Sequence, residues 1–512
     1  MSPVENQSGP LLAGIDVGTT NIKAVIFDLT GQPVTQASVA TPTYYPQPGW
    51  AHYEPEELWQ GAAAALRQAT GQLDRPDRIA GIAIASMAET AIPLDAHNRP
   101  TYHSVAWFDR RTQPQVDWLE RNIGAERMFE ISGMPLQPIF GLCKLLWFKQ
   151  NEPAAYSRTV RWLNVAEYIA YRLCGVQATD YSLACRVIAL NLRRREWDTA
   201  LLQDLEISPS LFAPLCDSGT RLGPVTPEAA AATGLPTTAQ VGAGGHDHIC
   251  GALAIGVIEP GDIMDSMGTS EPVFVPLNQP ISDPMVCRQG YAQGAHAVPG
   301  RYYATTSGFT SGASVEWFRD IVGRDLDYAT LIGEAEAVAP GSLGVYFMPH
   351  LRLANTPHYD PKGRGAFIGL STDAGRGVLF RALLEGLAYD CRYALEPLFD
   401  YPEVVRPRQI YAIGGSTRNP LLMRIKAAVF NRPITVATVA EATSLGAAIL
   451  GGLAAGVYAD LPSALQQLRH KHRLVEPDPA EAALYDRNFR QVYQQLYHAL
   501  KPLHHTIYQL QN

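Results

Sequence analysis

The chain has 512 residues, of which 46% are hydrophobic and 18% charged, and this composition is typical of a globular protein and not of a disordered one. Its length allows two or more domains. A formal net charge of -8 argues against a general nucleic-acid-binding surface, so we expect no nucleic-acid partner, although local N–H groups can still hold a phosphate ligand.

The N-terminal half opens with a strand meander. Three strand-like runs fill residues 11–40, and the first two form a hairpin that reads LLAGIDVGTTNIKAVIFDL. The pattern of apolar residues then predicts a helix over 56–70 and strands over 79–85 and 91–94. Trp and Leu at helical spacing indicate that helices dominate 112–175.

A second hairpin opens the C-terminal half. Residues 261–276 read GDIMDSMGTSEPVFVP, again two apolar runs around a Gly-Thr tip. Strands are predicted over 409–415 and 433–438, and a helix follows each of them. The first of these helices begins at Pro420 behind capping residues, and the second, over 441–455, consists of small residues.

Meanders combined with crossover helices predict an α/β fold in two similar lobes. We place the boundary near residue 255, which gives an N-terminal lobe of residues 1–255 and a C-terminal lobe of residues 256–512. Because each lobe carries one Gly-Thr hairpin, we interpret the chain as a duplicated fold that holds a nucleotide between its halves.

The two hairpin tips are the first candidate site. A tip of this kind leaves backbone N–H groups and hydroxyls free for phosphate oxygens. The tip residues are Gly18, Thr19 and Thr20 in the first hairpin and Gly268, Thr269 and Ser270 in the second. An ordinary tight turn is the alternative for either tip taken alone.

Asp16 and Lys23 flank the first tip. A carboxylate at Asp16 can hold Mg²⁺ through waters, and the metal neutralises the polyphosphate. Lys23 can add positive charge near the phosphates. The alternative for Asp16 is a strand-edge carboxylate satisfied by turn N–H groups, and the presence of a second hairpin favours the phosphate interpretation.

Asp247 lies in the segment GGHDH, at the predicted start of a helix. Its carboxylate can take the proton of a substrate hydroxyl that attacks the γ-phosphate, and the helix N-terminus favours its ionised form. A plain N-cap is the alternative for Asp247, and a metal site is the alternative for His246 and His248.

Two further segments complete the candidate site. Gly414 and Gly415 follow a strand and precede a helix, so a ligand can approach the backbone there. Glu89 follows a buried strand and can accept hydrogen bonds from two hydroxyls of a polyol. For Asp109, in the same polar region, a solvated face or a structural ion pair is the alternative.

The spacing of the cysteines and the length of the apolar segments indicate where in the cell the protein is located. The seven cysteines are scattered and include no Cys-x-x-Cys pair, which is typical of reduced thiols. No signal peptide is visible, and the longest small-apolar stretch, residues 444–457, is too short to span a bilayer. We therefore expect a cytoplasmic protein with no membrane partner.

In order and spacing, these motifs resemble those of the FGGY family of carbohydrate kinases, within the actin-like ATPase superfamily. The similarity spans nearly the whole chain and includes both hairpins, AWFDRRT, KLLWF, GGHDH, SGFTSGASVEW, NTPHYDPKGRGAFIGL, RALLEGLAYD, IGGSTRNPLLM and EATSLGAAILGG. The resemblance implies two lobes of the ribonuclease-H-like type around a cleft for ATP, Mg²⁺ and a small sugar or polyol.

The resemblance also implies roles for single residues. By position, Asp247 matches the catalytic base, Asp16 the metal-linked carboxylate, and Thr19 and Thr269 phosphate contacts. We expect both Asp16 and Asp247 to serve the metal. The positions that match nucleotide-lining residues are Gly312, Glu316, Gly415 and Asn419, and the substrate contacts that we assign are Met87, Glu89, Asp109, Asp247 and His248.

The chain departs from the family's known substrate patterns. Xylulokinases usually carry Gln-Met-His-Gly where residues 86–89 read SMAE, and the missing histidine weakens a xylulose assignment. Glycerol kinases carry an Arg-Glu pair there and a tyrosine at the position of Ile139, whereas this chain keeps Glu89 and has Ala88, so glycerol is not the expected substrate. Asp265 also interrupts a run that is usually apolar.

We therefore expect an ATP-dependent kinase for a primary hydroxyl of a small open-chain sugar or polyol, with a ketopentose of the xylulose or ribulose type first. Kinases for a tetritol, a hexulose or a deoxy-sugar, a non-catalytic sugar or nucleotide sensor, and an actin-like ATPase are the alternatives. Family analogy favours a homodimer or homotetramer.

Overall fold

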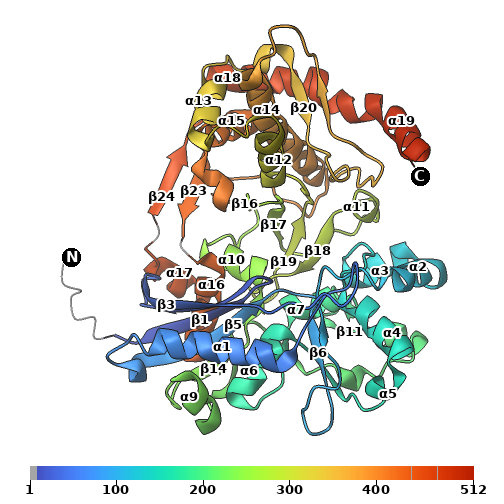
Figure 1. Cartoon of the computed structure of the whole chain (residues 1–512). Coiled ribbons are helices and arrows are strands. Elements are labelled where there is room, and N and C mark those ends of the chain that lie inside the picture. The colour runs from blue at the N-terminus through green and yellow to red at the C-terminus, as the bar shows by residue number, and fades with distance from the viewer. Residues whose placement is uncertain (1–8, 440, 470, 512) are drawn as a thin grey trace. The chain divides into compact units, whose positions relative to one another are not determined.

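The computed structural model describes residues 9–439, 441–469 and 471–511, and the chain forms two compact units (Figure 1). Unit 1 contains the described residues of Met1–Ile258, Gly294–Tyr302 and Val439–His470, and unit 2 contains the rest. The chain thus passes into unit 2 after Ile258 and later returns to unit 1 for two segments. The division into lobes of 1–255 and 256–512 stays a prediction.

Unit 1 is built on a seven-stranded mixed sheet with the strand order β13-β14-β5-β1-β2-β3, in which β15 pairs with β5. Its strands are β1 (Leu11–Val17), β2 (Asn21–Phe27), β3 (Pro33–Ala40), β5 (Ile79–Ser86), β13 (Arg221–Pro224), β14 (Gln240–Gly242) and β15 (Gly245–His246). Strands β1, β2 and β3 form the predicted antiparallel meander, and β5 and β14 continue the sheet in parallel.

Strand β1 is buried on both faces of the sheet. Its successive side chains point to opposite faces, so each face packs against a different helix. Leu11, Ala13 and Ile15 join a core cluster that includes Leu58 of α1 (Pro55–Thr70). On the other face, a Cβ atom at Gly14 would lie 1.8 Å from the carbonyl oxygen of Ser444, in α16 (Ala442–Ala454). This close approach is why α16, predicted as a small-residue helix, has that composition.

The same geometry brings three chain segments together at one end of the sheet. Asp16 lies two residues after Gly14, so it faces α16. Helix α10 (Asp247–Ala254) packs beside α16 so closely that a Cβ at Gly446 would lie 2.0 Å from the carbonyl oxygen of Cys250. The contact joins the N-terminal halves of the two helices, and it places their first turns near the carboxyl end of β1.

The rest of unit 1 consists of short elements. The helices are α2 (Gln113–Asn122), α3 (Ala125–Ser132), α4 (Gly141–Asn151), α5 (Pro153–Tyr156), α6 (Val165–Cys174), α7 (Tyr181–Ala184), the 3-10 turn η2 (Cys185–Val187), α8 (Thr199–Asp204), α9 (Pro227–Thr233) and α17 (Leu461–Gln467). The strands are β4 (His52–Tyr53), β6 (Ala91–Leu94), β7 (Ser104–Val105), β8 (Arg161–Asn164), β9 (Thr179–Asp180), β10 (Leu190–Asn191), β11 (Glu196–Trp197) and β12 (Leu215–Cys216).

Unit 2 repeats the same plan in a second seven-stranded sheet, of order β18-β19-β17-β16-β22-β23-β24. Its strands are β16 (Asp262–Ser266), β17 (Val273–Leu277), β18 (Ala292–Ala295), β19 (Tyr302–Thr305), β22 (Gln409–Ile413), β23 (Ile434–Thr438) and β24 (Lys471–Val475). Strand β16 is antiparallel to β17 and parallel to β22, as β1 is to β2 and β5. This repetition confirms the predicted two-part α/β fold.

The helices of unit 2 cover this sheet in a dense layer (Figure 1). Helix α14 (Arg376–Leu395) is almost wholly buried and packs with α15 (Pro420–Phe430). The other helices are α11 (Met285–Arg288), α12 (Gly312–Val322), α13 (Tyr328–Glu336), η5 (Glu396–Asp400), α18 (Pro479–Asn488), the π-helical turn η7 (Phe489–Tyr493) and α19 (Gln494–Gln511), and a small sheet joins β20 (Tyr346–Met348) to β21 (Ala366–Ile368).

The cysteines and the apolar character of the helices are two further features of the fold. All seven cysteines are free, as predicted. Within the described ranges, no helix combines the length and the apolar character that a membrane crossing needs. Residues 1–8, on which the absence of a signal peptide was judged, lie outside the described residues.

Candidate active site

Asp16 is the centre of an acidic cluster in unit 1. Its Oδ1 atom is buried and has no hydrogen-bond partner in the described part of the chain. Burial raises the pKa of Asp16 to about 7; the charges of Asp247 and Glu441 raise it as well, and Lys23 opposes them. A buried carboxylate oxygen without a partner, beside two further carboxylates, forms a site that attracts a cation.

Glu441 had no role in the sequence prediction, and the structure places it in this cluster. It is the N-cap of α16 and has a left-handed backbone, with φ 61°. Its Oε2 atom lies 2.6 Å from Nζ of Lys23, although the two residues are 418 positions apart. Lys23, which we expected beside phosphates, is therefore paired with a carboxylate within its own unit.

Asp247 is held through one carboxylate oxygen only. Oδ1 lies 3.0 Å from Nε2 of His246 and accepts a hydrogen bond of 2.6 Å from the backbone N–H of His248. Oδ2 has no partner among the residues that the structure describes, and the side chain is 26% exposed. Asp247 is thus oriented by its neighbours and keeps an oxygen available to a ligand.

The surroundings of Asp247 favour its charged form. Burial by itself raises the pKa of this carboxyl, but the charges of His246 and His248, together with their hydrogen bonds, outweigh burial and hold the pKa well below its usual value. The start of α10 acts in the same direction, because a helix N-terminus stabilises negative charge. Asp247 is therefore ionised near neutral pH, as a proton acceptor must be.

The first hairpin tip presents fewer free donors than predicted. The N–H of Gly18 donates to the carbonyl of Asn21 at 3.0 Å and closes the turn. The N–H groups of Thr19 and Thr20 donate to no backbone carbonyl within the described ranges. Trp107 Nε1 donates to Thr19 Oγ1 at 2.9 Å, so the segment AWFDRRT supports the tip.

Glu89 forms a buried ion pair with Arg186 of η2. Glu89 is strained, with a left-handed backbone at φ 59°, and its side chain is 5% exposed. Its Oε1 accepts a hydrogen bond of 2.5 Å from Nε of Arg186, and the buried Lys144 donates to its backbone carbonyl at 2.5 Å. Arg186 and Glu89 both influence the pKa of His248, which desolvation lowers, so this pair lies near Asp247.

The other predicted substrate contacts, Met87 and Asp109, are both buried. Met87 is buried, and its N–H donates to Val17 at the end of β1. Asp109 uses both carboxylate oxygens inside the protein: Arg111 pairs with it at 2.8 Å, and the N–H of Ala51 donates to it at 2.5 Å. For Asp109, the ion pair that we held open as an alternative is present.

In unit 2, the second hairpin tip meets two of the predicted nucleotide residues. The N–H of Gly312, at the start of α12, donates to the carbonyl of Gly268 at 3.0 Å. Gly414 has φ +98°, and a Cβ there would lie 2.5 Å from the carbonyl of Met267, so this position requires glycine. Thr269 and Ser270 are exposed at the tip.

The remaining predicted nucleotide residues lie on the same unit. Asn419 caps α15, because its side chain accepts hydrogen bonds of 3.1 Å from the N–H groups of Leu421 and Leu422. Gly415 belongs to the turn just before it. Glu316, on the exposed side of α12, accepts a hydrogen bond from Tyr328.

A buried charge cluster lies behind the second tip. Nζ of Lys426, on α15, contacts both Asp265 of β16 and Glu271, and Ser311 donates to the other oxygen of Glu271. All three charged side chains are at most 5% exposed. Burial raises the pKa of Asp265, and Lys426 opposes this shift. The unusual Asp265 of the sequence is thus neutralised inside the protein.

Three charged residues that form these pairs escaped the sequence prediction: Arg186, Glu441 and Lys426. Arg186 and Lys426 are each a cation inside an apolar segment, as in ACRVIAL and MRIKAAVF. Such a placement predicts a buried partner, because an isolated buried charge is costly. Nothing in the sequence identified which carboxylate that partner is.

Family models match most of the chain. The N-terminal domain of the FGGY family of carbohydrate kinases matches residues 11–254, and its C-terminal domain matches residues 264–455. A xylulose kinase of Lactococcus lactis is 28% identical over 496 residues, which cover 96% of this chain and 98% of that protein. A glycerol kinase of Thermococcus kodakarensis is 29% identical over 470 residues, 90% of this chain and 92% of that one.

Solved structures agree with these matches. The crystal structure of xylulose kinase from Rhodospirillum rubrum superposes with a TM-score of 0.89 at 29% identity, covering 97% of this chain and all of the other. The family models and the relatives together define an ATP-dependent carbohydrate kinase. The chain belongs to the FGGY family of carbohydrate kinases.

Proposed function

We propose that the protein transfers the γ-phosphoryl group of ATP to a primary hydroxyl of a small open-chain sugar, most readily a ketopentose of the xylulose or ribulose type. The observation that carries this proposal is Asp247, an ionised carboxylate with one clamped and one available oxygen, next to the acidic cluster at Asp16. The xylulose kinases among its relatives support the choice of a ketopentose.

In this proposal Asp247 is the general base. Oδ2 accepts a hydrogen bond from the attacking hydroxyl and takes its proton as the oxygen bonds to phosphorus. His246 and the backbone of His248 hold Oδ1, so the carboxylate needs no reorientation during the reaction. General-base catalysis of this kind contributes about 10²–10⁴ in rate.

Asp16 and its neighbours would hold Mg²⁺. The unpartnered Oδ1 of Asp16 and the nearby charges of Asp247 and Glu441 fit a small cation that prefers oxygen ligands. When bound, Mg²⁺ neutralises charge on the triphosphate. Lys23 can supply further positive charge from its place beside Glu441.

Each hairpin tip would contact phosphate through backbone N–H groups and hydroxyls. Thr19 and Thr20 offer these groups in unit 1, and Thr269 and Ser270 offer them in unit 2. The glycines Gly312, Gly414 and Gly415 surround the second tip closely, so we assign the nucleotide to that part of unit 2, with Glu316 and Asn419 nearby.

Glu89 and Arg186 would recognise the sugar hydroxyls. Arg186 occupies Oε1 of Glu89, and Oε2 has no partner among the described residues, so one oxygen remains for a substrate hydroxyl. Arg186 would orient Glu89 through their ion pair. His248 and Met87 complete the assignment next to Asp247.

The Glu89–Arg186 pair also favours a second candidate substrate, glycerol. The sequence argued against glycerol because Ala88 replaces the arginine of an Arg-Glu pair. Arg186 brings a guanidinium to Glu89 from another element, so the chemical pair exists without an arginine at position 88. Among the relatives, glycerol kinases stand beside xylulose kinases.

The experiment is sugar-dependent ADP release from Mg-ATP across glycerol, tetritols, pentitols, ketopentoses and ketohexoses. The proposal expects a single strong response, from xylulose or ribulose, and a strong response to glycerol alone would establish the second candidate. ADP release that ignores every sugar would contradict both. A cytoplasmic location and a homodimer or homotetramer remain proposals from family analogy.

A further inference from the structure

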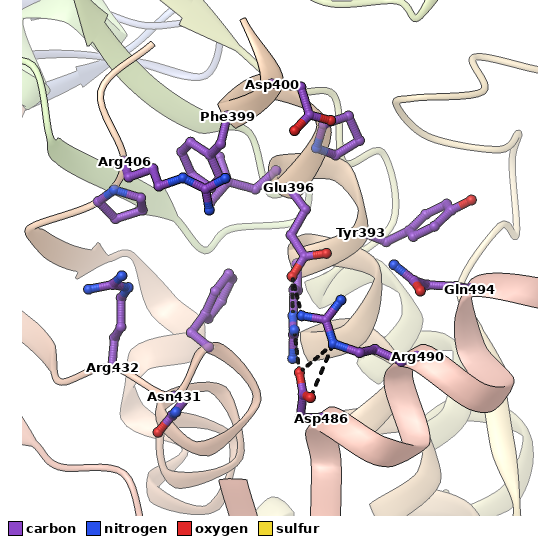
Figure 2. Close-up of a pocket in the computed structure, with 15 residues that line it drawn as sticks. Tyr393, Glu396, Phe399, Asp400, Arg406, Asn431, Arg432, Asp486, Arg490 and Gln494 are labelled. Carbon is purple, nitrogen blue, oxygen red and sulfur yellow. Dashed lines mark hydrogen bonds and ion pairs between the residues drawn. The ribbon is translucent and has the colours of Figure 1, made fainter. Parts of the chain in front are cut away.

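Unit 2 contains a pocket that none of the predicted site residues lines. Its volume is about 590 Å³, within the range of about 300–1,000 Å³ that small-molecule sites occupy. It opens where α14 continues into η5, next to the C-terminal end of α15 and the π-helical turn η7 (Figure 2). A π-helical turn within a helix is rare and frequently marks a functional site.

One side of the pocket is a saturated charge network. Arg392 pairs with Glu396 at 2.8 Å and with Asp486 at 2.6 Å, and it also donates to the carbonyl of Val429 at 2.9 Å. Arg490 of η7 pairs with Asp486 at 3.1 Å. Figure 2 shows these pairs as dashed lines. Two guanidinium groups and two carboxylates thus balance one another and make this wall rigid.

Arg406 and Arg432 lie on the other side of the pocket from Arg490 in Figure 2. Neither has a carboxylate partner among the described residues, in contrast to Arg392 and Arg490. A guanidinium group binds phosphate through paired, charge-assisted hydrogen bonds, and two unpaired groups on one wall suit a dianion. A phosphate group is therefore a suitable ligand for this wall.

Asp400 is the third charged side chain of the pocket without an ion-pair partner among the described residues, after Arg406 and Arg432. It lacks an ion-pair partner in the described part of the chain, and a carboxylate of this kind accepts hydrogen bonds from hydroxyls. Phe399 and Phe430 add apolar surface between the charged groups. The pocket is also much larger than a phosphate ion, so phosphate alone would leave most of it unfilled.

We propose that this pocket binds a phosphate monoester of a small polyhydroxylated molecule. Arg406 and Arg432 hold the phosphate group, and Asp400 accepts hydrogen bonds from the hydroxyls. Phosphorylated sugars, the class to which a carbohydrate kinase's own product belongs, have this chemistry. The proposal does not depend on the role of Asp247 or on which sugar the kinase phosphorylates.

The test is calorimetric titration of the full-length protein with D-ribose 5-phosphate, with inorganic phosphate and D-ribose as reference probes. We expect D-ribose 5-phosphate to bind and D-ribose not to bind. The double variant Arg406→Ala/Arg432→Ala should weaken binding by at least tenfold and leave kcat for ATP within about twofold. Arg324→Ala, an exposed arginine of unit 2 outside the pocket, is the matched control and should change neither.

The variant Asp400→Asn tests recognition of the ligand's hydroxyls separately from recognition of its phosphate group. It should weaken binding of D-ribose 5-phosphate severalfold without weakening that of inorganic phosphate. Unchanged affinity in the arginine double variant would place the ligand elsewhere, for example at the catalytic site, and would overturn the proposal. Absence of binding to the wild-type protein at millimolar concentration would overturn it as well, and an unchanged midpoint of thermal unfolding checks that each variant is folded.

Discussion

The two hairpins of this kinase share a backbone plan and use their aspartates in opposite ways. Asp16 and Asp265 are each the last residue but one in the first strand of their hairpin. Each lies opposite an alanine of the neighbouring parallel strand, Ala85 for Asp16 and Ala412 for Asp265. Burial raises the pKa of both carboxyls. In unit 2, Lys426 neutralises Asp265 inside the protein, whereas in unit 1 no cation of the described chain touches the buried oxygen of Asp16.

The difference shows that the same position in a repeated fold can have a different role in each unit. A buried carboxylate with a buried lysine is complete, and it holds β16, α15 and the loop at Glu271 together. A buried carboxylate without a buried cation lacks an interaction partner in the folded state, and a bound cation can supply that partner. We therefore propose that Asp16 in the hairpin of unit 1 takes part in catalysis, whereas the charge cluster of unit 2 stabilises the fold.

The largest effect is expected at Asp247. Asp247→Asn keeps the shape of the side chain and removes the proton acceptor, so kcat should fall by about 10²–10⁴-fold. Coupled ADP release with the best sugar measures this effect, and the free energy of unfolding should change little. If the variant kept more than about a tenth of wild-type kcat, the assignment of Asp247 as general base would be wrong.

The variant Asp16→Asn tests the role of the buried carboxylate oxygen that has no partner among the described residues. We expect kcat to fall by about a hundredfold, because the residues that hold a metal are typically worth that much or more. The free energy of unfolding in Mg²⁺-free buffer at pH 8 should stay the same or rise. The sign follows from the raised pKa: as pH rises from the ordinary value of 3.8 to the folded value of about 7, the carboxyl loses its proton in the unfolded state first, so stability falls. The cost is complete at pH 8, and asparagine removes it. A large loss of stability would show that Asp16 is structural.

Lys426→Met should lower the stability of the protein, in contrast to Asp16→Asn. It leaves Asp265 and Glu271 buried without their cation, so the free energy of unfolding should fall by about 3–5 kcal/mol. The matched control is Lys23→Met, whose ion pair with Glu441 is roughly one-third exposed, at 33% and 27% for the two side chains. That change should cost less than about 1 kcal/mol. Urea unfolding measures both, and equal losses would contradict the distinction between the two hairpins.

The smallest effect concerns substrate recognition. Glu89→Gln keeps the size of the side chain and removes the charge that pairs with Arg186, so KM for the sugar should rise about tenfold, as expected for the loss of one charged hydrogen bond. The KM for ATP should not change. Steady-state kinetics with each substrate varied in turn distinguish this result from a general loss of activity, in which both constants or kcat would move.

Local features of the sequence predicted the fold well, and contacts between distant elements explain what it missed. The meander of residues 11–40 and the cap at Asn419 follow from alternation, turn residues and helix-start preferences, all of which act within a few residues. The pair of Lys23 with Glu441 spans 418 positions, and that of Arg186 with Glu89 spans 97. No periodicity encodes such pairs, because the packing of helices on the sheet creates them.

The close packing of α16 on β1 illustrates the same limit. The small residues of this helix were visible in the sequence and predicted a helix over 441–455. That the helix returns to unit 1 and brings Glu441 to Asp16 depends on Gly14, whose missing side chain allows the backbones to touch. The glycine and the helix are 428 or more positions apart, so neither segment alone indicates the contact.

We propose that the cluster at Asp16 and Asp247 supports transfer of a phosphoryl group to a sugar hydroxyl. The most direct measurement is ³¹P NMR of the reaction of wild-type protein with Mg-ATP and the most active sugar, run beside Asp247→Asn. We expect wild-type protein to form a phosphate monoester on the primary hydroxyl, in equal amount to ADP, and the variant to form little of either product. Inorganic phosphate as the main product would rule out a sugar kinase, and equal ester formation by both proteins would rule out Asp247 as the general base.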